Sequence, residues 1–344
     1  MFFSSFKKKI KKKITIQSPS ILNNLEKSNI YNKYHNHKNT SFFSFGKKNP
    51  DKTFYIIKKT PGAGLFSNVL FILNHLKIAK NKNYIPFVDM QNFHTIYNEK
   101  NKIYKTKNAW EYYFENFSDY AIDEIYQSQN VYITSNLFEE TFFKDLNTEE
   151  ITKFFREHIR IKKNYSRFIK NFSDKNFENK KILGIHFRGT SYKNSPGHPF
   201  PATKKQIINK INELQLYNKF DKIFLVTEEE NYKKFLISKF GEKILFIKSS
   251  YRSNKNDAFK VYPRRRHRFK MGREALIETL LLSKCDYLIH ITSNISSAAI
   301  AWQLNKDQKR YRIDNGLNVN NIFIAEVLWY IKKILPESLG GFKC

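Results

Sequence analysis

The sequence predicts an α/β protein built of two lobes that meet at a central cleft. Its 344 residues correspond to roughly two domains of about 150 residues each. Strand-like and helix-like segments alternate along most of the chain, a pattern typical of parallel sheets with helices on both faces. Hydrophobic residues make up 41% of the chain and aromatic residues 16%, enough apolar surface for packed cores, so a disordered chain is excluded.

The chain divides into three parts on this interpretation. Residues 1–50 are rich in Lys, Asn and Ser and have no sustained periodicity, so we expect a poorly ordered basic tail. Residues 51–172 would form the N-terminal lobe together with a connecting helix. Residues 173–344 would form the C-terminal lobe.

The N-terminal lobe begins with a strand, a turn and a helix. The turn is Pro61-Gly62-Ala63-Gly64, where Gly62 and Gly64 permit backbone conformations that other residues resist. Apolar side chains then recur at helical spacing before a second strand. The predicted elements of this lobe are a strand over 54–59, a helix over 66–78, strands over 84–88 and 131–134, and a long connecting helix over 148–172.

Strands and helices alternate more regularly in the C-terminal lobe. We expect the side chain of Ser293 or Asn294 to cap a helix, because a side-chain oxygen there accepts hydrogen bonds from free amides. The predicted elements are strands over 181–187, 222–226, 243–247 and 286–291, helices over 203–216, 228–240, 272–283 and 293–302, and a basic loop over 249–270.

Charge and cysteine content narrow the possible partners. Lys and Arg number 61 against 31 Asp and Glu, a net charge of +30, which favours a polyanion as partner: nucleic acid, an anionic membrane or a phosphate-bearing substrate. The alternative is a compositional bias with no binding role.

The chain has only Cys285 and Cys344, too few for a disulfide framework, so we expect a reducing, cytoplasmic location. No apolar run is long enough to span a membrane.

The N-terminal tail is a candidate membrane contact. Six lysines between Lys7 and Lys13 follow Phe2, Phe3 and Phe6, a pattern suited to the surface of an anionic bilayer. The alternative is a solvated basic arm. The segment lacks the apolar core of a secretory signal, so the protein is expected to be cytoplasmic and at most peripheral to the membrane.

Ligands of open α/β sheets bind beyond the carboxyl ends of the strands, so residues that follow predicted strands are site candidates. Gly62 and Gly64 would let the backbone approach a phosphate or a sugar at the next helix start; a simple tight turn is the alternative. His186 and Arg188 alternate along the end of one strand and would face one pocket. A guanidinium there suits a diphosphate, whereas the alternatives are an ion pair between the lobes and a core histidine.

Three further groups follow or flank predicted strands. Glu228, Glu229 and Glu230 are interpreted as charges that complement the dipole of the following helix, not as site residues. Thr292 and Ser293 offer hydroxyl groups and free amides to an anion. Glu278 lies in an apolar helical run and requires a partner, for which the N–H edge of a guanine is one candidate.

Metal-binding motifs are absent from the sequence. It contains no Asp-x-Asp, no His-Glu-x-x-His and no cysteine cluster, so the usual acidic or thiolate ligand sets are missing. We therefore expect chemistry without a metal ion, in which Arg and Lys neutralise phosphate charge.

Several motifs follow one another in a distinctive order along the chain. They are the Gly62-Ala63-Gly64 turn, the block NAWEYYF at 108–114, His-x-Arg at 186–188, and REALIE at 273–278 followed by CDYLI at 285–289 and Thr292-Ser293. Their order is more specific than any single motif. In this order they resemble the inverting fucosyltransferases with a GT-B fold, in particular the α-1,6-fucosyltransferase and rhizobial nodulation fucosyltransferase group.

The resemblance implies a GT-B-like fold of two Rossmann-type lobes and an enzyme that transfers L-fucose from GDP-fucose to a glycan hydroxyl with inversion, without a metal ion or further cofactor. Arg188 would hold the diphosphate of the donor, and His186 and Glu278 would read the guanine. Ser293, with Thr292 beside it, would lie near the phosphates.

The resemblance also has gaps. Gly62 and Gly64 would line the cleft, but Ser191 stands where the group has Asp, and Gly189 replaces a second arginine. Residues 192–206 contain no carboxylate that could serve as a base. We nominate His198 as the catalytic base, acting beside Arg188, because imidazole accepts a hydroxyl proton near neutral pH; the alternative is an incidental histidine in a rigid proline-flanked loop.

Two competing functions remain open. Residues 262–270 form a basic run that a nucleic-acid-binding protein would use for phosphate contacts. The order of the motifs favours an enzyme over this alternative, so nucleic acid is not the expected partner. The other alternative is a related transferase that uses a different nucleotide sugar, because a fold does not fix the donor.

Overall fold

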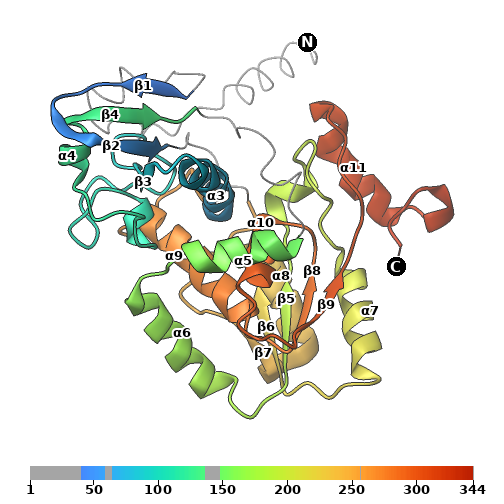
Figure 1. Ribbon diagram of the computed structural model, residues 1–344. Helices are drawn as coiled ribbons and strands as arrows, with labels where there is room; N and C mark the ends of the chain where they lie inside the picture. Colours follow the sequence, from blue (N-terminus) through green and yellow to red (C-terminus); the bar gives the residue numbers. More distant parts are fainter. Residues whose placement is uncertain (1–39, 59–63, 136–147, 256, 344) are drawn as a thin grey trace.

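The computed structural model describes residues 40–58, 64–135, 148–255 and 257–343. These residues form two α/β lobes (Figure 1), so the predicted fold class is confirmed. The N-terminal lobe holds a four-stranded sheet in the order β1-β4-β2-β3, in which β2 pairs parallel with β3 and β4, and β1 pairs antiparallel with β4. Its elements are β1 (Ser41–Phe43), β2 (Lys48–Ile57), α3 (Leu65–Asn81), β3 (Ile85–Val88), α4 (Ile122–Ile125) and β4 (Ser128–Ile133).

The expectation of a poorly ordered tail over residues 1–50 is corrected for its described end, because residues 41–43 and 48–50 are strand residues of the N-terminal sheet. Phe42 and Phe43 of β1 pair with Tyr132 and Val131 of β4. Two aromatic residues are enough to place this short strand on the sheet edge, although Lys, Asn and Ser surround it. Residues 1–39, which include Lys7 to Lys13, lie outside the described residues.

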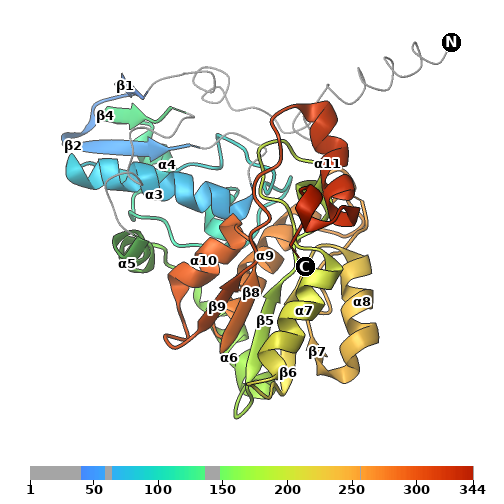
Figure 2. The ribbon, with the colours of Figure 1, turned by 90° about the vertical axis from the view of Figure 1, so that its right-hand side faces the viewer.

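Helix α3 covers one face of the N-terminal sheet (Figure 2). Side chains alternate along a strand, so Tyr55 and Ile57 of β2 pack in the same cluster as α3, whereas Phe54 and Ile56 pack in a separate cluster on the other face. The helix starts directly after Gly64. Its N-terminus therefore lies beyond the carboxyl end of β2, where a ligand of an α/β sheet is expected.

The C-terminal lobe contains a five-stranded, entirely parallel sheet in the order β7-β6-β5-β8-β9. The chain runs outward from the central β5 to β7 and then returns to β8 on the other side of β5. This is the strand order of a Rossmann-type sheet, and its switch point lies between β5 and β8. The elements are β5 (Ile182–His186), α7 (Lys204–Gln215), β6 (Lys222–Val226), α8 (Glu230–Phe240), β7 (Ile244–Leu245), α9 (His267–Leu282), β8 (Tyr287–His290), α10 (Asn294–Trp302), β9 (Lys309–Arg312) and α11 (Ile322–Ile334).

Helices cover both faces of this sheet. Ile182 and Phe224 pack in one apolar cluster with Leu281 of α9, whereas Leu183 and Ile185 pack in another, with residues of α7 and α8. Figure 2 shows α7 and α8 together on one side of the sheet. Strands buried on both faces explain the continuous apolar runs in the sequence.

The predicted connecting helix over 148–172 is wrong in one respect, because it is two helices, α5 (Thr148–His158) and α6 (Lys163–Asn176). The backbone between them pairs with another segment: the Glu115 N–H donates to the Arg160 carbonyl at 2.9 Å, and the Lys162 N–H donates to the Tyr113 carbonyl at 3.1 Å. Helical hydrogen bonding cannot continue through residues that are paired elsewhere.

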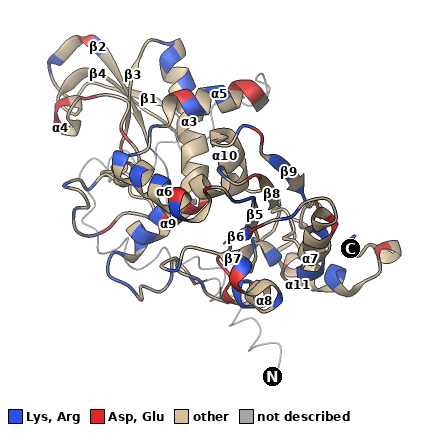
Figure 3. Cartoon of the chain, turned by 90° about the horizontal axis from the view of Figure 1, so that it is seen from below, with Lys and Arg blue, Asp and Glu red and all other residues tan. Residues whose placement is uncertain are grey.

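Helix α11 lies on the outside of the C-terminal lobe, and none of the elements predicted from sequence corresponds to it. Ala325 and Trp329 are buried, whereas Phe323, Val327 and Ile331 are each at least 45% exposed. Among the described residues, no helix combines the length and the apolar character needed to cross a membrane. Lys and Arg residues are distributed over both lobes (Figure 3).

Candidate functional site

A cavity of about 410 Å³ lies between the two lobes, beyond the carboxyl ends of β5, β6 and β8. The N-terminal lobe contributes Tyr97 and the first turn of α3, and the C-terminal lobe contributes one side of α9. The residues predicted from sequence that line the cavity are Gly64, His186, Arg188, His198, Glu278 and Ser293. Thr292 is exposed and does not line the cavity, and Gly62 lies outside the described residues.

Arg188 lies two residues beyond the end of β5 and lines this cavity. Its Nη1 lies 3.3 Å from Oε2 of Glu228, its Nη2 donates to the Ser191 hydroxyl at 3.2 Å, and its guanidinium lies 4.5 Å from the ring centroid of Tyr192. Its buried Nε has no hydrogen-bond partner. The side chain is therefore oriented by three neighbours, and its guanidinium, which lines the cavity, keeps N–H groups that these neighbours do not use.

Glu228 is a site residue that the sequence analysis missed. Its carboxylate accepts hydrogen bonds from the Gly189 N–H at 3.0 Å and from the Thr190 hydroxyl at 2.9 Å, in addition to the Arg188 contact. Burial opposes ionisation of Glu228, but Arg188 and the Gly189 N–H outweigh burial and lower its pKa. Because α8 begins only at Glu230, Glu228 positions Arg188 and is not a charge of the first helical turn.

The surroundings of Gly189 explain why this chain has no second arginine at the position where the fucosyltransferase group has one. A β-carbon at this position would overlap the carboxylate of Glu229 and lie within 2.9 Å of the Tyr232 ring. The Glu229 carboxylate is fixed there by the Thr190 N–H at 3.0 Å and by the Lys193 ammonium at 2.6 Å. The position leaves no room for a second arginine.

His186 and Ser293 meet across the switch point of the sheet. Nδ1 of His186 lies 3.3 Å from Oγ of Ser293, and the Ser293 hydroxyl also accepts from the Ser296 N–H at 3.1 Å, so it caps α10 as predicted. Complete burial lowers the pKa of His186 to about 3. The imidazole is therefore neutral at physiological pH and offers hydrogen bonds rather than charge.

Glu278 lies on the opposite wall, on α9. Its Oε1 is 3.3 Å from Nη2 of Arg252, so the partner that the sequence analysis required is a guanidinium. Burial raises the pKa of Glu278 to about 7, and the nearby Arg252 limits this increase. The carboxylate is 8% exposed and lines the cavity, where it can accept from a ligand N–H.

His198 belongs to the loop that closes one side of the cavity. Its ring centroid lies 5.0 Å from that of Tyr192, which also contacts Arg188. Burial, followed by the positive charge of Arg188, lowers the pKa of His198. Its imidazole is thus neutral near pH 7, the state that a proton acceptor requires.

Gly64 lines the N-terminal side of the cavity, but it does not have the unusual backbone conformation that the sequence predicts for this turn. Its φ of −63° is accessible to every residue type, so the expected unusual backbone is not present at this glycine. A β-carbon on Gly64 would have no atom within 4 Å. The glycine therefore leaves open space in the cavity next to the N-terminus of α3.

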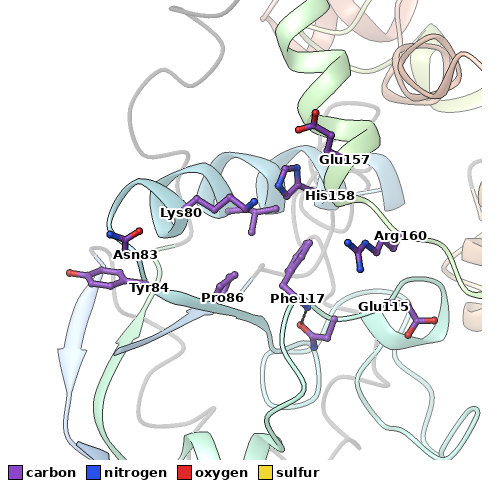
Figure 4. A pocket seen from close by; sticks show the side chains of 11 residues that line it. Lys80, Asn83, Tyr84, Pro86, Glu115, Phe117, Glu157, His158 and Arg160 are labelled. Atoms are coloured by element: carbon purple, nitrogen blue, oxygen red, sulfur yellow. Dashed lines mark hydrogen bonds between the residues drawn. The ribbon is translucent and has the colours of Figure 1, made fainter. Parts of the chain in front are cut away.

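A second cavity, of about 480 Å³, lies at the other end of α3 (Figure 4). Lys80 of α3, His158 of α5 and Phe117 of a loop approach it from three different segments. None of the predicted site residues lines it, so the cavity between the lobes remains the candidate site.

The part of the chain that the structure describes offers few side chains for thiol or metal chemistry. Cys285 is a buried free thiol, and burial raises its pKa well above the usual value. No group of three or more His, Cys, Asp and Glu side chains able to hold a metal ion occurs within residues 40–58, 64–135, 148–255 and 257–343.

No protein family and no curated protein matches the sequence. Several solved structures are similar in architecture. The NodZ alpha-1,6-fucosyltransferase soaked with GDP-fucose is 14% identical with a TM-score of 0.48, covering 73% of this chain and 93% of that chain. The Arabidopsis thaliana FUT1 mutant in complex with GDP is 10% identical with a TM-score of 0.46, covering 78% and 72%. POFUT1 in its apo form is 11% identical with a TM-score of 0.46, covering 77% and 99%. NodZ belongs to the fucosyltransferase group that the sequence motifs resemble.

Proposed function

We propose that the protein is a glycosyltransferase that moves L-fucose from GDP-fucose to a hydroxyl group of a glycan acceptor, with inversion and without a metal ion. One observation carries this proposal. Arg188 projects from the switch point of a parallel sheet into a cavity between two lobes, where an anionic ligand of such a sheet is expected. The order of the sequence motifs supports GDP-fucose as the donor.

Arg188 would bind the diphosphate of the donor. Its guanidinium is already oriented by Glu228 and Ser191, so little side-chain entropy is lost when phosphate oxygens bind it. The N-terminus of α10, which Ser293 caps, adds backbone dipoles on the same side. As the bond to the sugar breaks, negative charge grows on the diphosphate, and these fixed groups stabilise it.

The guanine would lie between α9 and the end of β5. An ionised Glu278 can accept hydrogen bonds from two adjacent N–H groups, and the neutral His186 supplies a donor or acceptor opposite. Ionisation of Glu278 is favoured when Arg252 and the two N–H groups surround it.

His198 would receive the proton of the acceptor. The acceptor oxygen forms a bond to the anomeric carbon while the bond between that carbon and the phosphate oxygen breaks, and the hydroxyl proton passes to the neutral imidazole. Attack from the face opposite the diphosphate inverts the anomeric centre. Arg188 and helix amides supply the positive charge that a metal ion provides in other transferases.

The experiment that tests this function is a donor panel. The purified protein is incubated with GDP-fucose, GDP-mannose, UDP-glucose and UDP-galactose, each with and without a chelator, and release of the nucleoside diphosphate is measured. We expect release from GDP-fucose that is unaffected by the chelator. Release from a UDP-sugar alone would support the related transferase, and release from none would contradict the proposal.

We further propose a contact between the enzyme and an anionic membrane surface. The lysines between Lys7 and Lys13 lie outside the described residues, but α11 supports the same contact with an exposed apolar face that ends at Lys332 and Lys333. A second copy is a poorer occupant of this face, because each chain carries a net charge of +30. The cytoplasmic location stays a prediction.

A further inference from the structure

The second cavity, at the far end of α3, has the size of a ligand site and is separate from the cavity between the lobes. Its volume of about 480 Å³ is within the range of small-molecule sites, roughly 300–1,000 Å³. Ser67 lines the cavity between the lobes and Leu76 lines the second cavity, so about 14 Å of α3 separates the two. A ligand in the second cavity would therefore leave the donor site free.

Phe117 gives the second cavity an apolar surface. The ring is half-buried, and the buried Trp110 supports it at a distance of 5.9 Å between ring centroids. Leu76 and Pro86 line the cavity as well. Figure 4 shows Phe117 between Pro86 and Arg160. A fixed aromatic ring with apolar neighbours favours a ligand that has an apolar face.

The charges that line the second cavity are balanced. Two cations, Lys80 and Arg160, line it together with two carboxylates, Glu115 and Glu157. In the whole chain, by contrast, Lys and Arg outnumber Asp and Glu by 61 to 31. An anion would gain little here, because repulsion from the carboxylates offsets its attraction to the cations. The lining instead favours an uncharged ligand that both donates and accepts hydrogen bonds.

Polar side chains of this cavity keep unused hydrogen-bonding groups. Glu115 lies 3.5 Å from Lys162, but the side chains of Arg160 and Glu157 are exposed and have no hydrogen-bond or ion-pair partner among the described residues. The Nδ1–H of His158 donates to the Phe154 carbonyl at 2.9 Å, so Nε2 of the neutral ring is an acceptor. Burial lowers the pKa of His158, and nearby positive charges lower it further, which keeps the ring neutral near pH 7.

We propose that the second cavity binds a sugar unit of a neutral saccharide. The C–H groups on one face of the sugar ring would cover Phe117, while its hydroxyl groups donate to Glu157 and Nε2 of His158 and accept from Arg160. A sugar ring combines an apolar face with several hydroxyl groups, which is the combination that this lining matches. The inference goes beyond the proposed function, because this site would hold a glycan without changing it.

The experiment measures saccharide binding by NMR titration in the absence of any donor. Maltotetraose, cellotetraose, glucuronic acid and AMP are titrated into wild type, Phe117→Ala, Arg160→Ala and Arg167→Ala, the last an exposed control on α6 (Lys163–Asn176). We expect wild type to bind at least one tetrasaccharide more tightly than glucuronic acid or AMP. Phe117→Ala should weaken this binding roughly 10-fold or more through lost apolar contact, and Arg160→Ala roughly 2- to 10-fold through a lost hydrogen bond. Arg167→Ala should bind as wild type does.

The outcomes separate this site from the proposed function. If wild type binds neither tetrasaccharide, or if Phe117→Ala and Arg160→Ala bind as tightly as wild type, the inference is overturned. Tighter binding of glucuronic acid or AMP would overturn it as well, because the site would then select an anion. If Phe117→Ala does not fold, Phe117→Leu, which keeps an apolar side chain without the ring, must show weakened binding. Because no donor is present, a failed donor panel would contradict the proposed function and leave this result unchanged.

Discussion

Nη1 of Arg188 and Oε2 of Glu228 lie 3.3 Å apart and join the ends of two neighbouring strands at the cavity. The register of the sheet brings them together, because His186 of β5 pairs with Val226 of β6 and both residues follow their strand by two positions. The carboxylate holds the guanidinium in place at the cavity. The site is thus organised before a ligand arrives, which lowers the cost of binding one.

Replacing His198 with Gln should remove the proton acceptor. Because the pKa of His198 lies below its ordinary value, wild-type activity should increase as pH rises through that lowered pKa and stay level above it. His198→Gln should lower kcat by about 10²- to 10⁴-fold and lose this acidic limb of the profile. Measured pH profiles of kcat test this, and a variant with the wild-type rate and limb would exclude His198 as the base.

Two glycines of the cavity region should respond differently to alanine. In Gly189→Ala the new methyl group overlaps Glu229 and Tyr232, so the free energy of unfolding should fall by roughly 1–3 kcal/mol. In the matched control Gly64→Ala it meets open space at an ordinary φ, and stability should stay within about 0.5 kcal/mol. Urea unfolding of both variants compares them directly; equal stability would show that Gly189 has room for a side chain.

Glu278 should make stability depend on pH. Burial raises the pKa of Glu278 from 4.5 to about 7, so the folded state binds a proton that the unfolded chain has already released. This stabilising contribution is complete below pH 4.5 and is lost as pH rises towards 8, by about 3 kcal/mol. Relative to wild type, Glu278→Gln should therefore gain that much between these pH values in urea unfolding. A constant difference would mean that Glu278 is ionised throughout.

The apolar face of α11 should bind lipid. Replacing Phe323, Val327 and Ile331 with Gln should strongly reduce co-sedimentation with vesicles that contain phosphatidylserine, because about 0.8 kcal/mol is lost for each buried CH₂ group. The control replaces Leu216 and Tyr217 with Gln. These residues follow α7, outside α11, and are 76% and 85% exposed. Equal binding of the two variants would contradict a membrane role for α11.

The fold was predictable wherever local pattern and tertiary structure agree. The strand over 222–226 matches β6, because both of its faces are buried and every position is apolar after the first. Strand β9, with the sequence KRYR, was missed because an exposed edge strand needs no apolar pattern. Helix α11 was missed as well, since residues 322–331 are apolar at every position except Glu326, and a continuous apolar run does not by itself distinguish a helix from a buried strand.

The site was predictable in part for a similar reason. The rule that ligands bind after strands singled out His186, Arg188 and Ser293, and the structure places all three on the cavity between the lobes. The rule also applied to Glu228. However, three consecutive carboxylates before a helix are explained equally well as charges that complement the helix dipole. Only the pairing of β5 with β6 shows which of the three faces Arg188. The Arg252 partner of Glu278 comes from a loop without periodicity, so no sequence pattern indicates that contact.

The central claim is that Arg188 holds the diphosphate of a guanine nucleotide, and calorimetric titration tests it most directly. GDP, UDP and ADP are titrated into wild type, Arg188→Ala and the control Arg310→Ala, with folding checked by circular dichroism. We predict that wild type and Arg310→Ala bind GDP in preference to the other nucleotides, and that Arg188→Ala binds it about 10²-fold more weakly, the loss expected for charge-assisted hydrogen bonds. Unchanged GDP affinity in a folded Arg188→Ala protein would contradict the claim.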